Sequence, residues 1–118
     1  MATRHYEGGC HCGAVRYGVD IDLDGAIQCN CSRCRRLGGP LAFAPESRFA
    51  LKSGEEALKD YLFNKHAIHH LFCTHCGIES FARGTAPDGQ TMIAVNVSCL
   101  DDVDLDALDP KKVDGKNF

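Results

Sequence analysis

The stretch CTHCG, Cys73–Gly77, places two cysteines three positions apart and follows them with a glycine. A turn of this kind directs both sulfur atoms to one side, and the glycine allows the backbone to bend behind them. The stretch CHCG, Cys10–Gly13, has the same character near the start of the chain. A structural zinc ion takes four ligands in a tetrahedron, and each turn supplies two. We therefore predict one structural zinc, bound by Cys10, Cys12, Cys73 and Cys76.

A third cluster, CNCSRCRR at Cys29–Arg36, has three cysteines within six positions. Three protein ligands with one exchangeable position are typical of catalytic zinc, whereas structural zinc has a closed set of four. We predict that Cys29, Cys31 and Cys34 hold a catalytic zinc, so that two zinc ions bind per chain. The alternative is that Cys99 or a histidine supplies a fourth ligand and closes the site. An open site should hold its ion less firmly, so we expect it to be partly empty after purification.

Length and charge exclude several classes of protein. The 118 residues suit a single domain, residues 1–118, with a net charge of −3 and no basic block. We therefore expect no nucleic-acid partner and no membrane partner, since no apolar run is long enough to span a bilayer. The first residues lack the apolar region of a secretory signal, so the predicted location is cytoplasmic. In that reducing compartment the eight cysteines favour metal binding, and disulfides are the alternative.

Short strand-like segments separated by Gly, Pro and Asn predict a mostly β fold. Residues 4–21 read as a hairpin, and residues 32–39 as one or two helical turns that begin with Ser32 as N-cap. Residues 55–63 suit either a strand or a short helix. The polar tail from about residue 110 is expected to be peripheral.

The charge of the second site indicates what it binds. Zinc with three thiolates carries a net charge of −1 and suits a soft sulfur ligand better than a hard oxygen ligand. We therefore expect an incoming thiolate in the fourth position. Arg33 and Arg36 are candidates for contacts to a carboxylate of that thiol substrate, and a solvated helix face is the alternative.

Three histidines precede the second zinc turn. If this segment is a strand, His66 and His70 share one face and His69 lies on the other. His70 is thus a candidate base or proton donor, and the alternative is a partly exposed strand residue with ordinary hydrogen bonds. Asn96 and Cys99 can approach the three-cysteine site from a neighbouring strand, unless Cys99 is only a buried, inert thiol.

Four motifs occur in an order that resembles the glutathione-dependent formaldehyde-activating enzyme family: EGGCHCGAVRY, CNCSRCRRLGGP, HHLFCTHCG and VNVSCLDDVDLDAL. They cover nearly the whole chain. The resemblance implies a single small domain of coiled antiparallel sheets, sometimes called a β-tent, with zinc knuckles and one or two short helical turns. It also implies a structural zinc and a second zinc on the seven clustered cysteines. The activity it implies joins glutathione to formaldehyde and gives S-hydroxymethylglutathione.

The residues and the resemblance together lead to a zinc-dependent carbon–sulfur lyase, or thiol–aldehyde adduct-forming enzyme. Its partners would be a small-molecule thiol such as glutathione and an aldehyde. A non-catalytic binding module that uses both zinc ions structurally is the first alternative. A redox sensor that oxidises the three-cysteine cluster and releases its zinc is the second.

Overall fold

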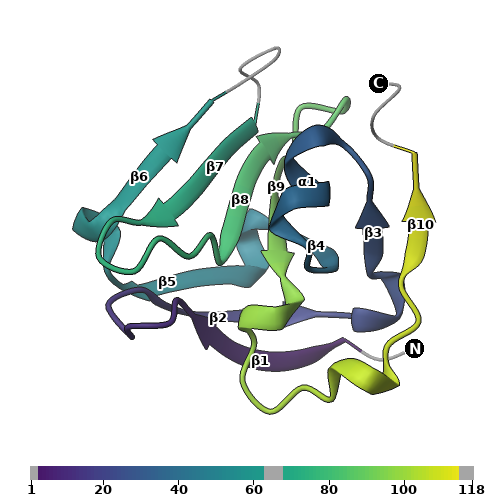
Figure 1. Ribbon diagram of the computed structural model, residues 1–118, viewed down its shortest axis with the longest axis horizontal. Coiled ribbons are helices and arrows are strands. Elements are labelled where there is room, and N and C mark those ends of the chain that lie inside the picture. Colours follow the sequence, from purple (N-terminus) through teal and green to yellow (C-terminus); the bar gives the residue numbers. More distant parts are fainter. Residues whose placement is uncertain (1–2, 63–67, 115–118) are drawn as a thin grey trace.

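The computed structural model describes residues 3–62 and 68–114, which form two β-sheets (Figure 1). The three-stranded sheet has the order β1-β2-β5. Its strands are β1 (Arg4–Gly9), β2 (Arg16–Ile21) and β5 (Phe49–Ser53). The seven-stranded sheet has the order β10-β3-β4-β9-β8-β7-β6. Its strands are β3 (Ile27–Cys29), β4 (Leu41–Pro45), β6 (Leu58–Tyr61), β7 (Ile68–Cys73), β8 (Phe81–Thr85), β9 (Thr91–Asn96) and β10 (Lys111–Val113). The predicted mostly β fold is therefore confirmed.

One short α-helix, α1 (Ser32–Leu37), interrupts the strands of the described residues. The predicted N-cap, Ser32, is wrong by one position: Cys31 caps the helix, because its sulfur accepts a hydrogen bond from the backbone amide of Cys34. The helix ends at Gly38, whose φ of 85° is the left-handed conformation that glycine adopts without strain. The other helical turns are 3₁₀ turns: η1 (Leu23–Gly25), η2 (Glu46–Arg48), η3 (Glu55–Ala57), η4 (Val97–Cys99) and η5 (Leu105–Ala107).

The structure specifies two segments that the sequence left open: the polar tail from about residue 110, and residues 55–63. The polar tail is peripheral as expected, and it also forms a strand: Lys111–Val113 pairs in parallel with Ile27–Cys29 as β10 at the edge of the seven-stranded sheet. Without β10, the edge of β3 would have unpaired backbone N–H and C=O groups. A polar segment can form hydrogen bonds to these groups while its own side chains stay exposed to water. Residues 55–63 form a 3₁₀ turn and then strand β6, not an α-helix, as far as residue 62. No helix in the described part of the chain is long and apolar enough to cross a membrane.

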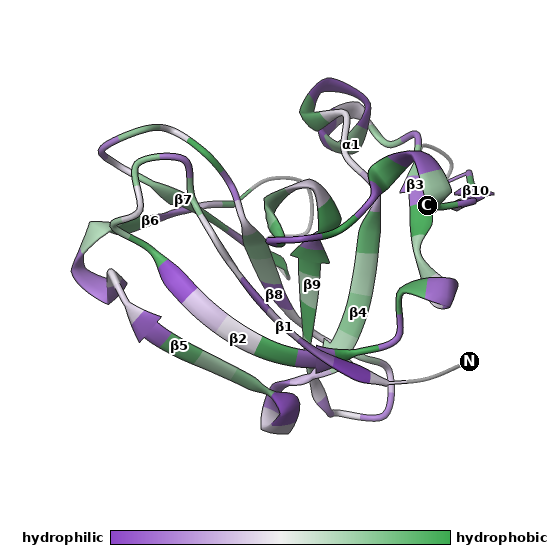
Figure 2. Cartoon of the chain, turned by 90° about the horizontal axis from the view of Figure 1, so that it is seen from below, coloured by the Kyte–Doolittle hydropathy of each residue, from purple (hydrophilic) through white to green (hydrophobic). Residues whose placement is uncertain are grey.

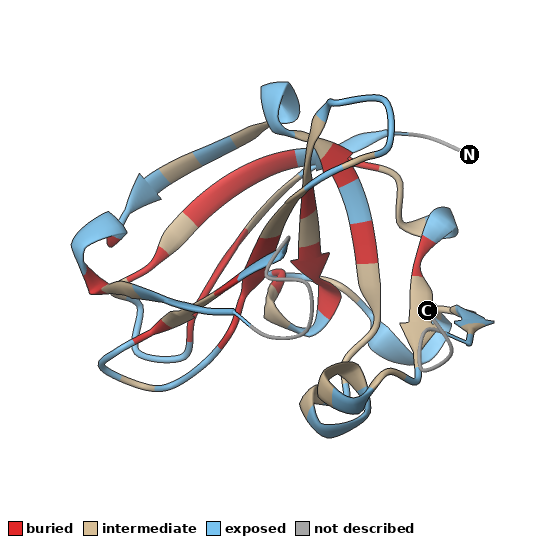
Figure 3. Cartoon of the chain, turned by 90° about the horizontal axis from the view of Figure 1, so that it is seen from above, coloured by how far each residue is buried: buried red, intermediate tan, exposed pale blue. Residues whose placement is uncertain are grey.

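The hydrophobic core lies between the two sheets, and β2, β4 and β9 contribute many of its buried residues (Figures 2 and 3). At its centre three rings meet: the ring centroid of Tyr17 is 5.0 Å from that of Phe49 and 5.6 Å from that of Phe81. The hydroxyl of Tyr17 donates a hydrogen bond of 2.9 Å to the backbone carbonyl of Ser80. Tyr17 thus joins β2 of one sheet to the start of β8 in the other.

The opposite face of the seven-stranded sheet, here called the outer face, carries the residues that surround α1. Strand pairing places five side chains in one row across this face. They are Tyr61, His70, Ala82, Ala94 and Phe43, on β6, β7, β8, β9 and β4 in turn. The residues before and after each of these point to the opposite face of the sheet, because successive side chains of a strand alternate between its two faces. Helix α1 lies over this face beside β9 and β4 (Figure 1).

The Tyr17 contact can be tested by Tyr17→Phe. The Ser80 carbonyl keeps a second donor, the backbone amide of Asn96 at 3.0 Å, so it is not left unsatisfied. We expect the free energy of unfolding to fall by about 1 kcal/mol, measured by urea denaturation at constant metal concentration. The matched control Tyr6→Phe, on partly buried Tyr6 of β1, should change it by less than about 0.5 kcal/mol. Equal losses in the two variants would contradict the role given to the Tyr17 hydroxyl.

Candidate metal centres

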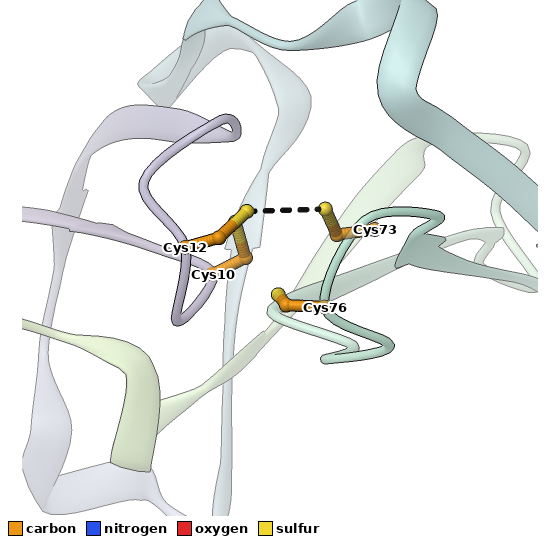
Figure 4. A group of neighbouring side chains, drawn as sticks. All are labelled: Cys10, Cys12, Cys73 and Cys76. Carbon is orange, nitrogen blue, oxygen red and sulfur yellow. Dashed lines mark hydrogen bonds between the residues drawn. The ribbon is translucent and has the colours of Figure 1, made fainter.

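Four cysteine sulfurs converge from two turns that are far apart in the sequence (Figure 4). Cys10 and Cys12 lie in the turn between β1 and β2, and Cys73 and Cys76 lie at the end of β7 and in the turn that follows. The sulfur of Cys12 is 3.6 Å from that of Cys10 and 3.7 Å from that of Cys73. Four thiolates around a tetrahedral zinc, each at 2.3 Å, would have their sulfurs about 3.8 Å apart. The geometry therefore fits a metal ion better than a disulfide, and the four cysteines are free thiols.

Backbone amides of both turns point at these sulfurs. The amide of Val15 donates to the sulfur of Cys10 at 3.3 Å, and the amide of His75 donates to that of Cys73 at 3.4 Å. The backbone amide of Ile78 lowers the pKa of Cys76 to about 6. Such hydrogen bonds favour the thiolate, which is the form that binds metal. At Cys12 the backbone amide of Ala14 acts in the same direction, but burial and the neighbouring cysteines outweigh it and raise the pKa to about 11. A cation among the four sulfurs would therefore be needed for all of them to be thiolates at once.

The second cluster is formed by Cys29, Cys31 and Cys34, whose sulfurs lie within 4.8 Å of one another. Cys29 ends β3, Cys31 caps α1 and Cys34 lies inside the helix. The amide of Cys31 donates to the sulfur of Cys29 at 3.4 Å, and the amide of Cys34 donates to that of Cys31 at 3.3 Å. The helix start therefore fixes the direction of two sulfurs. The short strand fixes the third.

The three sulfurs of this cluster are close enough together that a cation would be needed to balance their negative charge as thiolates. Burial raises the pKa of the Cys34 thiol, and the neighbouring Cys31 raises it further. Three deprotonated sulfurs at this distance would repel one another, so a cation among them is needed for all three to be thiolates at once. Within residues 3–62 and 68–114, no fourth Cys, His, Asp or Glu joins the group. His66 lies outside the described residues.

Cys99 belongs to neither cluster. It is half-buried in the turn η4, and burial raises its pKa to about 11. The charged groups that act on it include Cys10 and Cys76, so it lies on the side of the four-cysteine cluster. The position agrees with an inert thiol, one of the two alternatives given by the sequence.

A chain of polar side chains connects α1 to the outer face. The guanidinium of Arg33 donates to Glu79 Oε1, with an Nε–Oε1 distance of 3.0 Å, and lies 4.6 Å from the centre of the Tyr61 ring. The other carboxylate oxygen of Glu79, Oε2, lies 3.6 Å from Nδ1 of the His70 ring. Burial alone would raise the pKa of Glu79, but hydrogen bonds from His70 and Arg33 lower it below its usual range. Glu79 is therefore a buried carboxylate held between the guanidinium of Arg33 and the ring of His70.

His70 is the histidine that the strand buries, with 8% of its surface exposed. The alternative of a partly exposed residue is wrong for His70, whose ring faces the buried carboxylate of Glu79. His69 points to the opposite face, is exposed, and bonds to Asp60 through its ring nitrogen. His11 and His75 are exposed and do not join the cysteine sulfurs.

The two arginines predicted to contact substrate differ in their surroundings. Arg33 is already paired with Glu79, whereas Arg36 is exposed and donates to the backbone carbonyl of Ser32, one turn earlier in its own helix, at 2.8 Å. Both line an open hollow of about 430 Å³, together with Ser32, Leu37 and Tyr61. Arg36 is thus the arginine more available to an anionic ligand.

Asn96 anchors the exit of α1 to the outer face. Its side-chain amide donates to the backbone carbonyl of Glu79 at 3.1 Å, and its oxygen accepts from the backbone amide of Ser98 at 3.1 Å. A β-carbon on Gly39 would come within 2.6 Å of that oxygen, so the chain leaving α1 passes directly against Asn96. Sequence reasoning found Asn96 but missed Glu79 and Tyr61. The only signal for Glu79 is a charged residue immediately before the buried pair Ser80 and Phe81.

The chain resembles known proteins both in sequence and in fold. Residues 5–114 match the sequence profile of the family described as glutathione-dependent formaldehyde-activating enzyme. A crystal structure of a Rhodobacter sphaeroides protein has the same fold, with a TM-score of 0.81 and 33% sequence identity. The match covers 91% of this chain and 99% of that one. The resemblance predicted from the four motifs is therefore confirmed.

The Arg33–Glu79 pair can be tested by Glu79→Gln. The amide keeps an acceptor but removes the charge that faces Arg33 and His70, so we expect the free energy of unfolding to fall by about 1–3 kcal/mol in urea denaturation. The matched control is Glu46→Gln, because Glu46 also pairs with an arginine (Arg83, 3.4 Å) but is 53% exposed. It should change stability by less than about 0.5 kcal/mol. A control loss as large as that of Glu79→Gln would contradict a special role for the buried pair.

Proposed function

We propose that this chain, which belongs to the glutathione-dependent formaldehyde-activating enzyme family, is a zinc-dependent carbon–sulfur lyase acting on a thiol–aldehyde adduct. The reaction joins glutathione to formaldehyde to give S-hydroxymethylglutathione, or joins a related pair. The observation that carries the proposal is the unequal size of the two cysteine groups, four in one and three in the other. Four thiolates complete a tetrahedron and serve the fold, whereas three leave a position for substrate.

Both groups suit zinc as their metal. Their donors are all sulfur, and backbone amides in each group favour the thiolate. Cys10, Cys12, Cys73 and Cys76 would hold the structural ion, and Cys29, Cys31 and Cys34 the catalytic one. When bound at the second site, zinc would keep the thiol of the co-substrate deprotonated at neutral pH and still nucleophilic.

The bond changes are few. The substrate sulfur attacks the aldehyde carbon, a carbon–sulfur bond forms, and the carbonyl oxygen becomes a hydroxyl by taking up the proton that the thiol gave up. The chain's task is to hold the thiol and supply that proton. Arg36 is placed at the open hollow beside α1, where it can bind a carboxylate of the thiol. His70, supported by Glu79, can hold a proton on the sheet face below α1.

Glutathione also agrees with a cytoplasmic location, which we propose for the chain as a single zinc-binding domain spanning residues 1–118. Glutathione keeps that compartment reducing, and free thiols are needed at all seven clustered cysteines. The partners are thus a small thiol and an aldehyde.

The catalytic site is tested by Cys31→Ser. This change removes one of the three sulfur ligands, while the serine hydroxyl can still cap α1. We therefore expect the bound zinc to fall from two ions per chain to one, measured by elemental analysis of the purified protein. Adduct formation, followed by exchange NMR with glutathione and formaldehyde, should fall to the rate of the thiols without protein. The control Cys99→Ser should keep two zinc ions and the full rate. Turnover by Cys31→Ser above that background would refute the role of this site.

The structural site is tested by Cys73→Ser. Metal binding and folding are coupled in small zinc domains, so removing one of four ligands should abolish cooperative unfolding and reduce the dispersion of the amide NMR spectrum. The same change at Cys99 should leave both intact, because Cys99 lies outside the cluster. A Cys73→Ser protein that unfolds at the same urea concentration as the original chain would show that the four-cysteine group does not stabilise the fold.

A further inference from the structure

The outer face of the seven-stranded sheet has an apolar groove beside the site described above. It has a volume of about 260 Å³, and small residues of β8 and β9 form its floor. Larger apolar side chains border it. Among its lining residues are Phe43, Ile68, Ala82, Gly84, Met92 and Ala94. Phe43 is 45% exposed and Ile68 is 50% exposed, which is unusual for large apolar side chains that lie near each other.

Strand register makes the groove continuous with the surroundings of α1. Ala82 and Ala94 belong to the row that also contains His70 and Tyr61, and Tyr61 lies under the guanidinium of Arg33. Along β9, Ala94 is two residues from Asn96, which the exit of α1 contacts, and Met92 is two residues further on. Two residues of a strand span about 7 Å. The groove therefore begins one row from the point where the chain leaves α1, and it extends away from that point along the strands.

This arrangement suits a linear apolar substituent better than a compact polar one. Most residues that line the groove are aliphatic, aromatic or glycine, and Arg83 and Thr85 are the polar members of the lining. A carbon chain that enters the groove from the side of α1 would lie over Ala94 and Ala82 and extend toward Met92. Formaldehyde has no carbon chain and would leave the groove unused.

We propose that the groove binds the alkyl chain of an aliphatic aldehyde of several carbons, joined to the thiol as an S-(1-hydroxyalkyl) adduct. The inference rests on the proposed function, because it takes the reacting carbon to be at the three-cysteine cluster. The bond changes are those given above, with an alkyl group in place of one hydrogen of formaldehyde. Phe43, Ala94 and Met92 then determine specificity for chain length.

The experiment uses the zinc-loaded full chain and unreactive thioethers that mimic the adduct: S-methyl-, S-butyl- and S-hexylglutathione. Each methylene moved from water to an apolar site contributes about 0.8 kcal/mol, so affinity should rise about three- to four-fold per methylene until the groove is full. The methyl NMR signals of Ala82, Ala94 and Met92 should shift with the longer chains. An affinity that is independent of chain length, or shifts confined to other residues, would overturn the proposal.

Two variants and one control test whether the alkyl chain of the ligand lies in the groove. Ala94→Leu fills the floor and Phe43→Ala removes a wall, so each should flatten the gain per methylene. The matched control Ala50→Leu, at an exposed strand position on β5 of the other sheet, should leave the gain unchanged. If the control and the groove variants behave alike, the alkyl chain of the ligand does not lie in the groove. Methyl shifts that follow protein concentration instead of ligand would also overturn the proposal, since a second copy would then occupy this face.

Turnover separates this inference from the function on which it rests. With glutathione as thiol, the ratio of the zinc-dependent rate for hexanal to that for formaldehyde should be higher in the original chain than in Ala94→Leu. Zinc-dependent turnover of formaldehyde with no gain in affinity along the thioether series would overturn the groove alone. A thioether series that behaves as expected, without zinc-dependent turnover of any aldehyde, would overturn the proposed function and leave the groove as a binding site.

Discussion

The convergence of four thiols from two distant turns is the constraint on which the rest of the structure depends. Cys12 and Cys73 are 61 positions apart, and their sulfurs lie 3.7 Å from each other. A chain of 118 residues buries limited apolar area, so a metal ion shared by these thiols would link positions about half the chain apart and add stability that a small core lacks. Such a link would join the turn between β1 and β2 of the three-stranded sheet to the end of β7. It would thereby hold together the two sheets that enclose Tyr17.

The second cluster uses a different device, because its three sulfurs come from one short segment. The strand β3 and the first turn of α1 hold them, and nothing distant is tied together. The distant anchor is instead Arg33, which lies between Cys31 and Cys34 in the sequence and binds Glu79, three residues after Cys76. The loop that ends one cluster thus supports the helix that carries the other. A change at Glu79 should therefore affect both the fold and the orientation of the three sulfurs.

The sequence was sufficient for the cysteine groups, the mostly β fold and the family, since spacing and turn residues are local properties. It was insufficient where a contact joins segments far apart. The cap of α1 is Cys31 because a sulfur already aimed at the helix start takes the hydrogen bond that Ser32 was expected to accept. The polar tail becomes β10 because β3 offers a free edge. Glu79 and Tyr61 matter only through Arg33 and His70, which no periodicity reveals.

The outer face shows how one sheet can serve two chemical purposes. Along one row across the strands, the side chains change from Tyr61 and His70, beneath a charged network, to Ala82, Ala94 and Phe43, which are apolar. Strand register alone sets this order, so a polar end and an apolar end lie side by side without a loop between them. A ligand with a charged thiol part and an apolar chain matches that division. A small, fully polar adduct would use only half of it.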